Sequence, residues 1–445
     1  MSKEKIIVGL DIGTTKICVI VGRENEFGKL EVLGMGKAVS EGVIRGTVTN
    51  IQRTVDSINK AINEAEEQSG VGIGKVNVGI AGQHIQSTTQ HGSIISDNGD
   101  GEIGVRDVNR LINDMYKVVM PAGKEIIHVM PQAYTVDDNF DIKDPIGEAG
   151  IRLEADFHII TADTSAISNI NKSVRRSGLA NQGLEIENLV LEPIASSMAV
   201  LNNVDKEMGV ALVDIGGGTT DLAIFYDGII RHTAVIPYGG EIISRDIKEG
   251  CNVLPKEAEQ LKVRFGKALA NEAKANEIIS IPGLRNRPAK EISMKNLAHI
   301  IQARMEEIIE MVHNEILRSG YKNRLGAGIV LTGGGSQMQY ARQLFEYMTG
   351  LDTQIGYPNE HLGKCKVEEI KSPMYSTSVG LVLAGFKALD ERDQKRFEEN
   401  AQELSQEDID SGKGFIKGIT QRLNKSFNLK NMLLDSDLED EDIEY

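Results

Sequence analysis

Cysteine is scarce and tryptophan is absent in this sequence of 445 residues. The three cysteines, Cys18, Cys251 and Cys365, are far apart and form no CxxC pair. This excludes a disulfide-rich scaffold or a cysteine zinc site and favours a reducing cytoplasm. The 8 histidines are scattered without an HExxH pattern, so each is expected to be an ordinary surface or core residue.

Long apolar runs are also missing. No run approaches the roughly 18 residues needed to span a bilayer. The first apolar run, Ile6–Leu10, is short and is followed by Asp11, so we expect no signal peptide. Any contact with a membrane is therefore expected to be peripheral.

Positive charge is in deficit. Lys and Arg number 49 against 65 Asp and Glu, which gives a formal charge of −16 and argues against a general nucleic-acid binder. Hydrophobic residues make up 40% and charged residues 26%, as in soluble globular proteins, and the length suits two to four domains. The last eleven residues, 435–445, form an acidic tail without a single basic residue.

An internal repeat is the most informative feature present. Residues 8–20 read VGLDIGTTKICVI, and residues 210–225 read VALVDIGGGTTDLAIF. Each is an apolar run, an aspartate, a Gly/Thr turn and a second apolar run, which predicts a β-hairpin whose turn requires positive φ. Asp11 and Asp214 lie 203 residues apart, so the repeat predicts two similar domains of about 200 residues.

Between and after the hairpins, helical and strand patterns alternate. The amphipathic stretch Ile51–Glu67 precedes the strand-like Val76–Ala81, which is typical of α/β sheets covered by helices. The pattern changes at 84–162 to a strand, a helix at roughly Val105–Val119 and two further strands, Glu125–Val136 and Ile151–Thr161, so we expect a small inserted subdomain there. A charged helical insertion is expected at 228–305, with a helix over Lys256–Ala273. After residue 388 the composition becomes that of a solvated linker.

The turns of both hairpins are candidate phosphate-binding loops. Glycine lets backbone N–H groups approach a phosphate, threonine adds hydroxyl donors, lysine neutralises charge, and aspartate holds Mg²⁺ through water. One such turn alone is more often only a turn, but two facing copies would clamp a polyphosphate. A third loop, Gly333–Gly335, follows an apolar strand and precedes a helix expected near Gln339. No P-loop or dinucleotide-binding fingerprint occurs in a suitable context.

Two segments rich in small residues, Glu192–Ala199 and Ser376–Gly385, suit helices that pack closely at a hinge between domains. Simple packing is the alternative for either one alone. A third segment, 412–434, is different. At 100° per residue, Ile416, Ile419, Leu423 and Phe427 fall within about 80° of arc, and Phe415 widens the stripe to about 120°. The basic residues Lys413, Lys417, Arg422 and Lys425 lie outside it. This pattern favours a helix lying in a membrane interface, and a helix docked on the core is the alternative.

Together, the two DxG(GG)TT hairpins, the two small-residue helices and the TGGGS loop at 332–336 resemble the actin-like ATPase superfamily over residues 5–388. Within it, DPIG at 144–147, GIRLEADFHIIT at 150–161 and LEPIAS at 191–196 resemble the FtsA family of bacterial cell-division proteins. The resemblance implies an α/β, two-domain actin-like (ribonuclease-H-like, duplicated) ATPase fold with an inserted small α+β subdomain and a C-terminal amphipathic helix.

The resemblance also implies a domain order. The first actin-like domain is expected at 1–83 and 163–205, an SHS2-type subdomain at 84–162, the second actin-like domain at 206–227 and 306–388, an inserted helical subdomain at 228–305, a disordered linker at 389–411, a membrane-targeting helix at 412–434 and an acidic tail at 435–445.

Site residues follow from the same resemblance. Asp11 and Asp214 would lie near Mg²⁺, and Glu192 and Asp214 are the candidate catalytic residues. The residues implied to hold ATP are Gly13, Thr14, Thr15, Lys16, Gly216, Gly217, Gly218, Thr219, Thr220, Gly239, Gly240, Glu259, Lys262, Gly333, Gly334, Gly335 and Met338. Those implied to contact the membrane are Phe415, Ile416, Ile419, Leu423, Phe427, Lys417, Arg422 and Lys425.

The function implied is that of an ATP-binding protein with weak or no ATPase activity at the cytoplasmic face of the bacterial membrane, at the division site. It would polymerise with itself, bind the C-terminal tail of FtsZ through the second insertion, tether the FtsZ ring and recruit later division proteins, without nucleic acid. The alternatives are a PilM-like pilus-assembly adaptor and an actin-fold ATPase or phosphotransferase.

Overall fold

A computed structural model describes residues 5–97, 99, 101–178, 183–274, 276–281, 289–363, 365 and 367–411, with side chains described up to residue 394. Contacts divide the chain into two units, Met1–Phe386 and Lys387–Tyr445, each of which is considered by itself. None of the helices in these ranges is both long enough and apolar enough to cross a bilayer.

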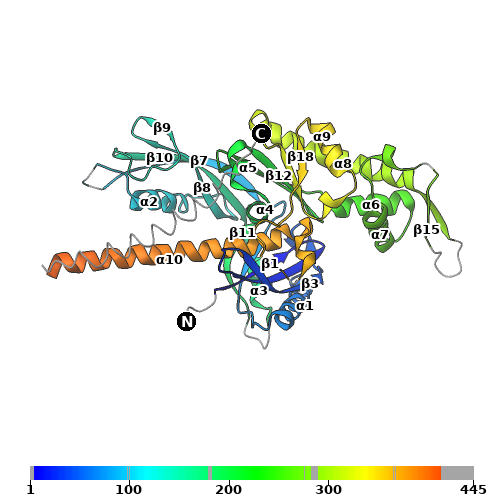
Figure 1. Cartoon of the computed structure of the whole chain (residues 1–445), viewed down its shortest axis with the longest axis horizontal. Coiled ribbons are helices and arrows are strands. Elements are labelled where there is room, and N and C mark those ends of the chain that lie inside the picture. The colour runs from blue at the N-terminus through cyan, green and yellow to red at the C-terminus, as the bar shows by residue number, and fades with distance from the viewer. Residues whose placement is uncertain are drawn as a thin grey trace, which may run out of the picture. The chain divides into compact units, whose positions relative to one another are not determined.

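The first sheet has the strand order β11-β6-β1-β2-β3. Its strands are β1 (Ile6–Ile12), β2 (Lys16–Glu24), β3 (Leu30–Val39), β6 (Lys75–Ile80) and β11 (Glu185–Leu191). β1, β2 and β3 are antiparallel neighbours, whereas β6 and β11 run parallel to β1. Helices α1 (Ile51–Ser69) and α3 (Thr164–Arg175) pack beside this sheet and bury apolar residues of one face in its core (Figure 1).

The helix α1 shows how local sequence sets these elements. Asn50 caps its start by accepting a hydrogen bond from the Arg53 N–H, and Gly70 ends it in the left-handed conformation. Between these signals the buried residues Val55, Ile58 and Ile62 follow helical spacing. The predicted helix Ile51–Glu67 is therefore confirmed, with two further residues at its end.

The second sheet repeats the first. Its order is β14-β13-β12-β17-β18, with β12 (Val210–Ile215), β13 (Thr220–Tyr226), β14 (Ile229–Ile236), β17 (Ile329–Thr332) and β18 (Thr353–Ile355). Again three strands are antiparallel neighbours and two run parallel to the first of them. The same topology in both sheets confirms the duplication that the repeated hairpins predicted.

The first insertion is a small α+β unit. Its sheet, ordered β7-β10-β8-β9, contains β7 (Gln86–Ile95), β8 (Lys124–Val136), β9 (Asn139–Ile142) and β10 (Arg152–Asp163), and α2 (Val105–Met115) packs against it. The sequence predicted this helix and the strands β8 and β10. It also extended the helix to Val119, four residues too far.

The second insertion begins later than predicted. Residues 229–236 form β14 of the second sheet, so the prediction that this insertion starts at 228 is wrong. β14 is the edge strand of that sheet, and all of its residues are buried or half-buried. The insertion contains α6 (Gly240–Cys251), α7 (Pro255–Phe265), β15 (Ile278–Ile281), β16 (Lys290–Ser293) and α8 (Met294–Arg318), which runs past the predicted boundary at 305. The helix predicted over Lys256–Ala273 ends before Gly266.

Further helices beside the sheet of the second domain are α4 (Glu192–Val200), the short α5 (Asn203–Met208) and α9 (Ala341–Thr349). α4 and α5 precede β12, and α9 follows the third glycine loop, starting two residues after the predicted Gln339. α4 and the start of α10 (Ser376–Ser411) contain the two small-residue segments. They pack closely, because a Cβ on Gly380 would lie 1.8 Å from the carbonyl oxygen of Ala195.

α10 overturns the prediction of a disordered linker at 389–411. The helix, orange in Figure 1, is continuous from Ser376 to Ser411. Residues 387–411 contain neither glycine nor proline and are rich in Glu, Gln, Arg, Lys and Ala, which favour helix as much as solvation. Lys387 and Glu391 also form an (i, i+4) pair with 4.0 Å between Nζ and Oε1.

Candidate functional site

The first hairpin places a buried carboxylate beside its turn. Asp11 is 5% exposed, and its Oδ2 accepts hydrogen bonds from Lys16 Nζ at 3.5 Å and from Ser378 Oγ at 2.8 Å. The Lys16 ammonium also lies 4.7 Å from the ring centroid of Tyr375. Burial alone would lower the pKa of Lys16, but the nearby carboxylate of Asp11 raises it. Lys16 is therefore a fixed positive charge beside Asp11.

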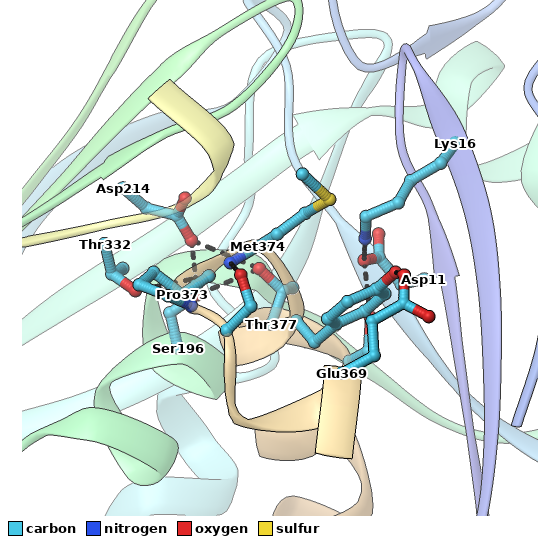
Figure 2. A network of polar contacts seen from close by, with 12 residues as sticks. Asp11, Lys16, Ser196, Asp214, Thr332, Glu369, Pro373, Met374 and Thr377 are labelled. Carbon is cyan, nitrogen blue, oxygen red and sulfur yellow. Dashed lines mark hydrogen bonds and ion pairs between the residues drawn. The ribbon is translucent and has the colours of Figure 1, made fainter. Parts of the chain in front are cut away.

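The second hairpin provides the matching carboxylate. Asp214 is 7% exposed, and its Oδ2 accepts hydrogen bonds from Ser196 Oγ at 2.6 Å and Thr377 Oγ1 at 3.1 Å. Figure 2 shows Asp214 and Asp11 on opposite sides of the segment that carries Pro373, Met374 and Thr377. The start of α10 thus donates to an aspartate of each domain, through Thr377 and Ser378.

The two turns meet. A Cβ on Gly217 would lie 1.9 Å from Thr15 Oγ1, and one on Gly218 would lie 2.4 Å from Thr14 Oγ1. Residues 13–15 and 216–219 all have negative φ, so the prediction that these turns require positive φ is wrong. The glycines of the second turn are needed instead because the threonines of the first turn leave no room for a side chain.

The second turn is held from one side by the start of α6. The N–H groups of Gly240 and Glu241 donate to the carbonyl oxygens of Gly216 and Gly217, at 2.9 and 2.7 Å. A Cβ on Gly239 would lie 2.6 Å from the Gly216 oxygen. Within the turn and its strand, Thr219 Oγ1 donates to Asp221, and Thr220 Oγ1 donates to the Tyr238 carbonyl.

α7 is fastened to the same side. Lys262 Nζ donates to the Gly240 carbonyl oxygen at 2.9 Å and to Glu259 Oε2 at 2.7 Å, and Ser244 donates to the same Glu259 oxygen. The structure therefore brings the predicted residues Gly240, Glu259 and Lys262 together, next to the second turn.

The third glycine loop borders the second turn from the other side. A Cβ on Gly333 would lie 2.2 Å from Asp214 Oδ1, and one on Gly335 would lie 2.3 Å from Ile215 Cγ2. Gly333 has φ of 82°, which a glycine adopts without strain. Gly334 lies between these two glycines in the chain. A Cβ on Gly266, at the end of α7, would lie 2.6 Å from Met338 Sδ.

Carboxylates crowd behind the turns. Burial and the nearby Asp11 raise the pKa of Glu192 well above its usual value. Burial also raises the pKa of Asp214, although the hydrogen bonds from Ser196 and Thr377 act in the opposite direction. A protonated Glu192 cannot act as a base. The catalytic role predicted for Glu192 therefore requires a nearby cation that favours its ionised form.

Asp221 is the residue of this cluster that the sequence reasoning did not select. It pairs with Asp214 across the hairpin and is 4% exposed. Its Oδ1 is buried without a hydrogen-bond partner, and burial followed by the charge of Asp214 raises its pKa to about 8. The two repeated turns differ in the residue that follows them, which is Lys16 in the first hairpin and the acidic Asp221 in the second. This difference is the sequence feature that could have indicated a role for Asp221.

The donor set fits a nucleotide with a hydrated divalent cation. The glycine turns of both domains allow backbone N–H groups to come close to a phosphate bound between them. In addition, Asp221 Oδ1 is a buried acceptor without a hydrogen-bond donor. Within the described ranges, no three His, Cys, Asp or Glu side chains form a direct metal site.

The predicted membrane-binding residues, from Phe415 to Phe427, lie outside the described residues.

Comparison with known proteins gives a consistent match. A family model for "Cell division protein FtsA" matches residues 211–380, and one for the "SHS2 domain inserted in FTSA" matches residues 82–161. The cell division protein FtsA of Pseudomonas aeruginosa is 42% identical over 383 residues, which cover 86% of this chain and 90% of that protein. FtsA of Escherichia coli K12 is 34% identical, with the same coverage, and FtsA of Bacillus subtilis is 35% identical, covering 86% and 84%.

Among solved structures, a PilM–PilN type IV pilus biogenesis complex is similar with a TM-score of 0.61 and 14% identity, over 86% of this chain and 99% of that one. That likeness concerns the fold alone. With the duplicated sheets and the matched insertion, it confirms the expected two-domain actin-like fold with an inserted α+β subdomain.

Proposed function

The chain belongs to the FtsA family of cell division proteins, and from that premise we propose that it binds ATP with Mg²⁺ and links a division polymer to the membrane. The observation that carries the nucleotide part is the meeting of Thr14 and Thr15 with Gly218 and Gly217, with Asp11 and Asp214 buried behind. Phosphates held there would contact both domains, so binding would favour one arrangement of the domains over others.

In the proposed site, Gly13–Lys16 and Gly216–Thr220 hold the phosphates, and Asp11 and Asp214 hold the waters of Mg²⁺. Gly239, Gly240, Glu259 and Lys262 lie on one side of the nucleoside, and Gly333–Gly335 and Met338 lie on the other. When bound, Mg²⁺ supplies positive charge to the phosphates and to the carboxylate cluster.

The proposed partners follow from membership of the family. The protein assembles with further copies of itself, binds the C-terminal tail of FtsZ through the second insertion and recruits later division proteins. The segment 412–434 holds the assembly at the cytoplasmic face of the membrane at the division site. A single helix of this length binds a membrane weakly. In a polymer, once one copy is bound, the helices of the linked copies are held at a high effective concentration near the membrane.

Co-sedimentation tests this proposal. Full-length protein is mixed with purified FtsZ and anionic liposomes, with and without Mg²⁺ and ATP. A variant lacking 412–434 should bind ATP normally yet leave FtsZ in the supernatant. A matched variant lacking only 435–445 should still carry FtsZ into the liposome pellet. Equal pelleting of the 412–434 deletion would contradict the membrane role.

A pilus-assembly adaptor is the second candidate, favoured by the fold likeness to the PilM–PilN complex. The identities of 34–42% with FtsA proteins rank it below the first. Selective binding of FtsZ tail peptide by the purified chain supports the first proposal, and binding of a pilus membrane peptide in its place overturns it.

A further inference from the structure

A small hairpin of the first domain touches both phosphate turns. Its strands are β4 (Val43–Ile44) and β5 (Thr47–Val48), joined by Arg45 and Gly46. The Gly46 N–H donates to Thr14 Oγ1 at 3.0 Å. A Cβ on Gly218 would lie 2.9 Å from Cα of Arg45. The tip of this hairpin therefore lies where the two turns meet.

Arg45 occupies a backbone conformation that does not suit arginine. Its φ is 48° and that of Gly46 is 73°. A two-residue hairpin turn with both φ values positive strongly favours Asn-Gly, and most other residues are strained there by about 1–2 kcal/mol. The backbone therefore gives no reason for arginine at this position, and strain of this kind concentrates at functional sites.

The side chain of Arg45 is half-buried but unpaired. Among the described residues its guanidinium has no hydrogen-bond or ion-pair partner, and its one interaction is with the ring of Tyr238, 5.9 Å from Cζ to the centroid. Arg304, which contacts the same Tyr238 ring, is by contrast paired with the carboxylate of Asp246. An unpaired guanidinium that is partly removed from water favours an anionic partner.

Arg45 and Tyr238 line a cavity beside the second turn. It is lined by Arg45, Gly218, Pro237, Tyr238, Gly239, Glu241, Ile242 and Arg245. Two guanidinium groups face one exposed carboxylate, that of Glu241, and Arg245 is also unpaired among the described residues. The glycines Gly218 and Gly239 leave backbone exposed on the cavity wall, so the cavity suits an oxyanion adjoining the phosphate turns.

We propose that Arg45 binds the terminal phosphate of the nucleotide and gives the site a preference for the triphosphate over the diphosphate. The guanidinium forms paired hydrogen bonds to phosphate oxygens, for which its planar fork is suited. Because Arg45 belongs to the first domain and the cavity glycines belong to the second, the terminal phosphate is held from both sides. This inference rests on the proposed binding of ATP and names the residue that distinguishes ATP from ADP.

Fluorescence titration with mant-ATP and mant-ADP in the presence of Mg²⁺ tests the proposal on the full-length chain. Arg45→Ala should weaken mant-ATP binding by about 10- to 100-fold, the value of a hydrogen-bonded charge, and mant-ADP binding by less than about twofold. Arg45→Lys keeps the charge without the fork and should fall between. Arg53→Ala, which removes an exposed arginine of α1 away from the cavity, is the matched control and should bind both like the wild type.

The outcomes separate this inference from the proposed function. If the wild type binds neither nucleotide, the proposed function fails. If it binds both and Arg45→Ala weakens both equally, or neither, the role of Arg45 is refuted. Thermal unfolding of the unliganded chain adds a readout that a purely structural role would move. Arg45→Ala should unfold at the same temperature as the wild type, since alanine is strained at this φ as arginine is and no ion pair is broken.

Discussion

Thr377, the second residue of α10, donates a hydrogen bond of 3.1 Å to Asp214, which lies 163 residues earlier in the chain. Ser196 of α4 donates to the same oxygen at 2.6 Å, and the two hydroxyls lie 3.0 Å apart. Figure 2 shows the three side chains converging. Two helices thus fix one carboxylate oxygen of Asp214, and its Oδ1 stays available for the water shell of a cation.

Replacing Thr377 tests whether this fixing matters for the cation. Thr377→Val keeps the shape but removes the hydroxyl, so Asp214 should be less well oriented and the Mg²⁺ concentration that half-saturates nucleotide binding should rise about tenfold. Thr377→Ser keeps the donor and should restore the wild-type value. The check is titration of Mg²⁺ at fixed mant-ATP. An unchanged Mg²⁺ requirement in Thr377→Val would show that Ser196 alone suffices.

The contact between the phosphate turns gives a second prediction. Gly217→Ala places a Cβ 1.9 Å from Thr15 Oγ1 and 3.1 Å from Thr15 Cβ, so the Thr15 hydroxyl must rotate away or the turns must separate, and nucleotide affinity should fall by about tenfold or more. The double variant Gly217→Ala with Thr15→Gly removes the clash and should recover part of the loss. Gly72→Ala is the control, because nothing lies within 4 Å of its added Cβ. Calorimetric titration with ATP measures all three, and normal affinity in Gly217→Ala would refute the argument.

The repeated hairpins made the duplicated fold predictable, because an aspartate, a Gly/Thr turn and flanking apolar runs are local in sequence. The reason for the glycines was not predictable. It depends on Thr14 and Thr15, about 200 residues away in the chain, and only the folded structure shows that Gly217 and Gly218 leave them room.

The residues around the acids were harder to find. Ser196 and Thr377 lie in segments whose small residues indicated close helix packing, and nothing local marks their hydroxyls as partners of Asp214. Arg45 sits in a turn that carries no motif. For the predicted linker, the composition alone could not decide, since charged residues that favour a solvated coil also favour the helix α10.

The packing of α4 on α10 yields a third prediction. Gly380→Ala adds a Cβ that would lie 1.8 Å from the Ala195 carbonyl oxygen, and backbone on both sides cannot move as a flexible side chain does. We expect the free energy of unfolding to fall by about 2–3 kcal/mol, as for overpacked cores. Gly74→Ala, whose Cβ meets open space, should change it by less than about 1 kcal/mol. Urea unfolding followed by circular dichroism compares them, and equal stability would contradict the close packing.

His128 predicts how stability depends on pH. Burial lowers its pKa to about 4, and its Nε2 accepts a hydrogen bond from the Leu191 N–H at 3.0 Å, which requires the unprotonated nitrogen. Because the pKa is lower in the folded chain than the ordinary 6.5, this contribution is fully present above about pH 6.5 and is lost as the pH falls toward 4. At pH 5 the loss is at most about 2 kcal/mol relative to pH 8. His128→Gln, which cannot gain a proton, should lack this part of the decline. Urea unfolding at pH 8, 6 and 5 measures the difference, and parallel curves for the two proteins would show that His128 contributes nothing to it.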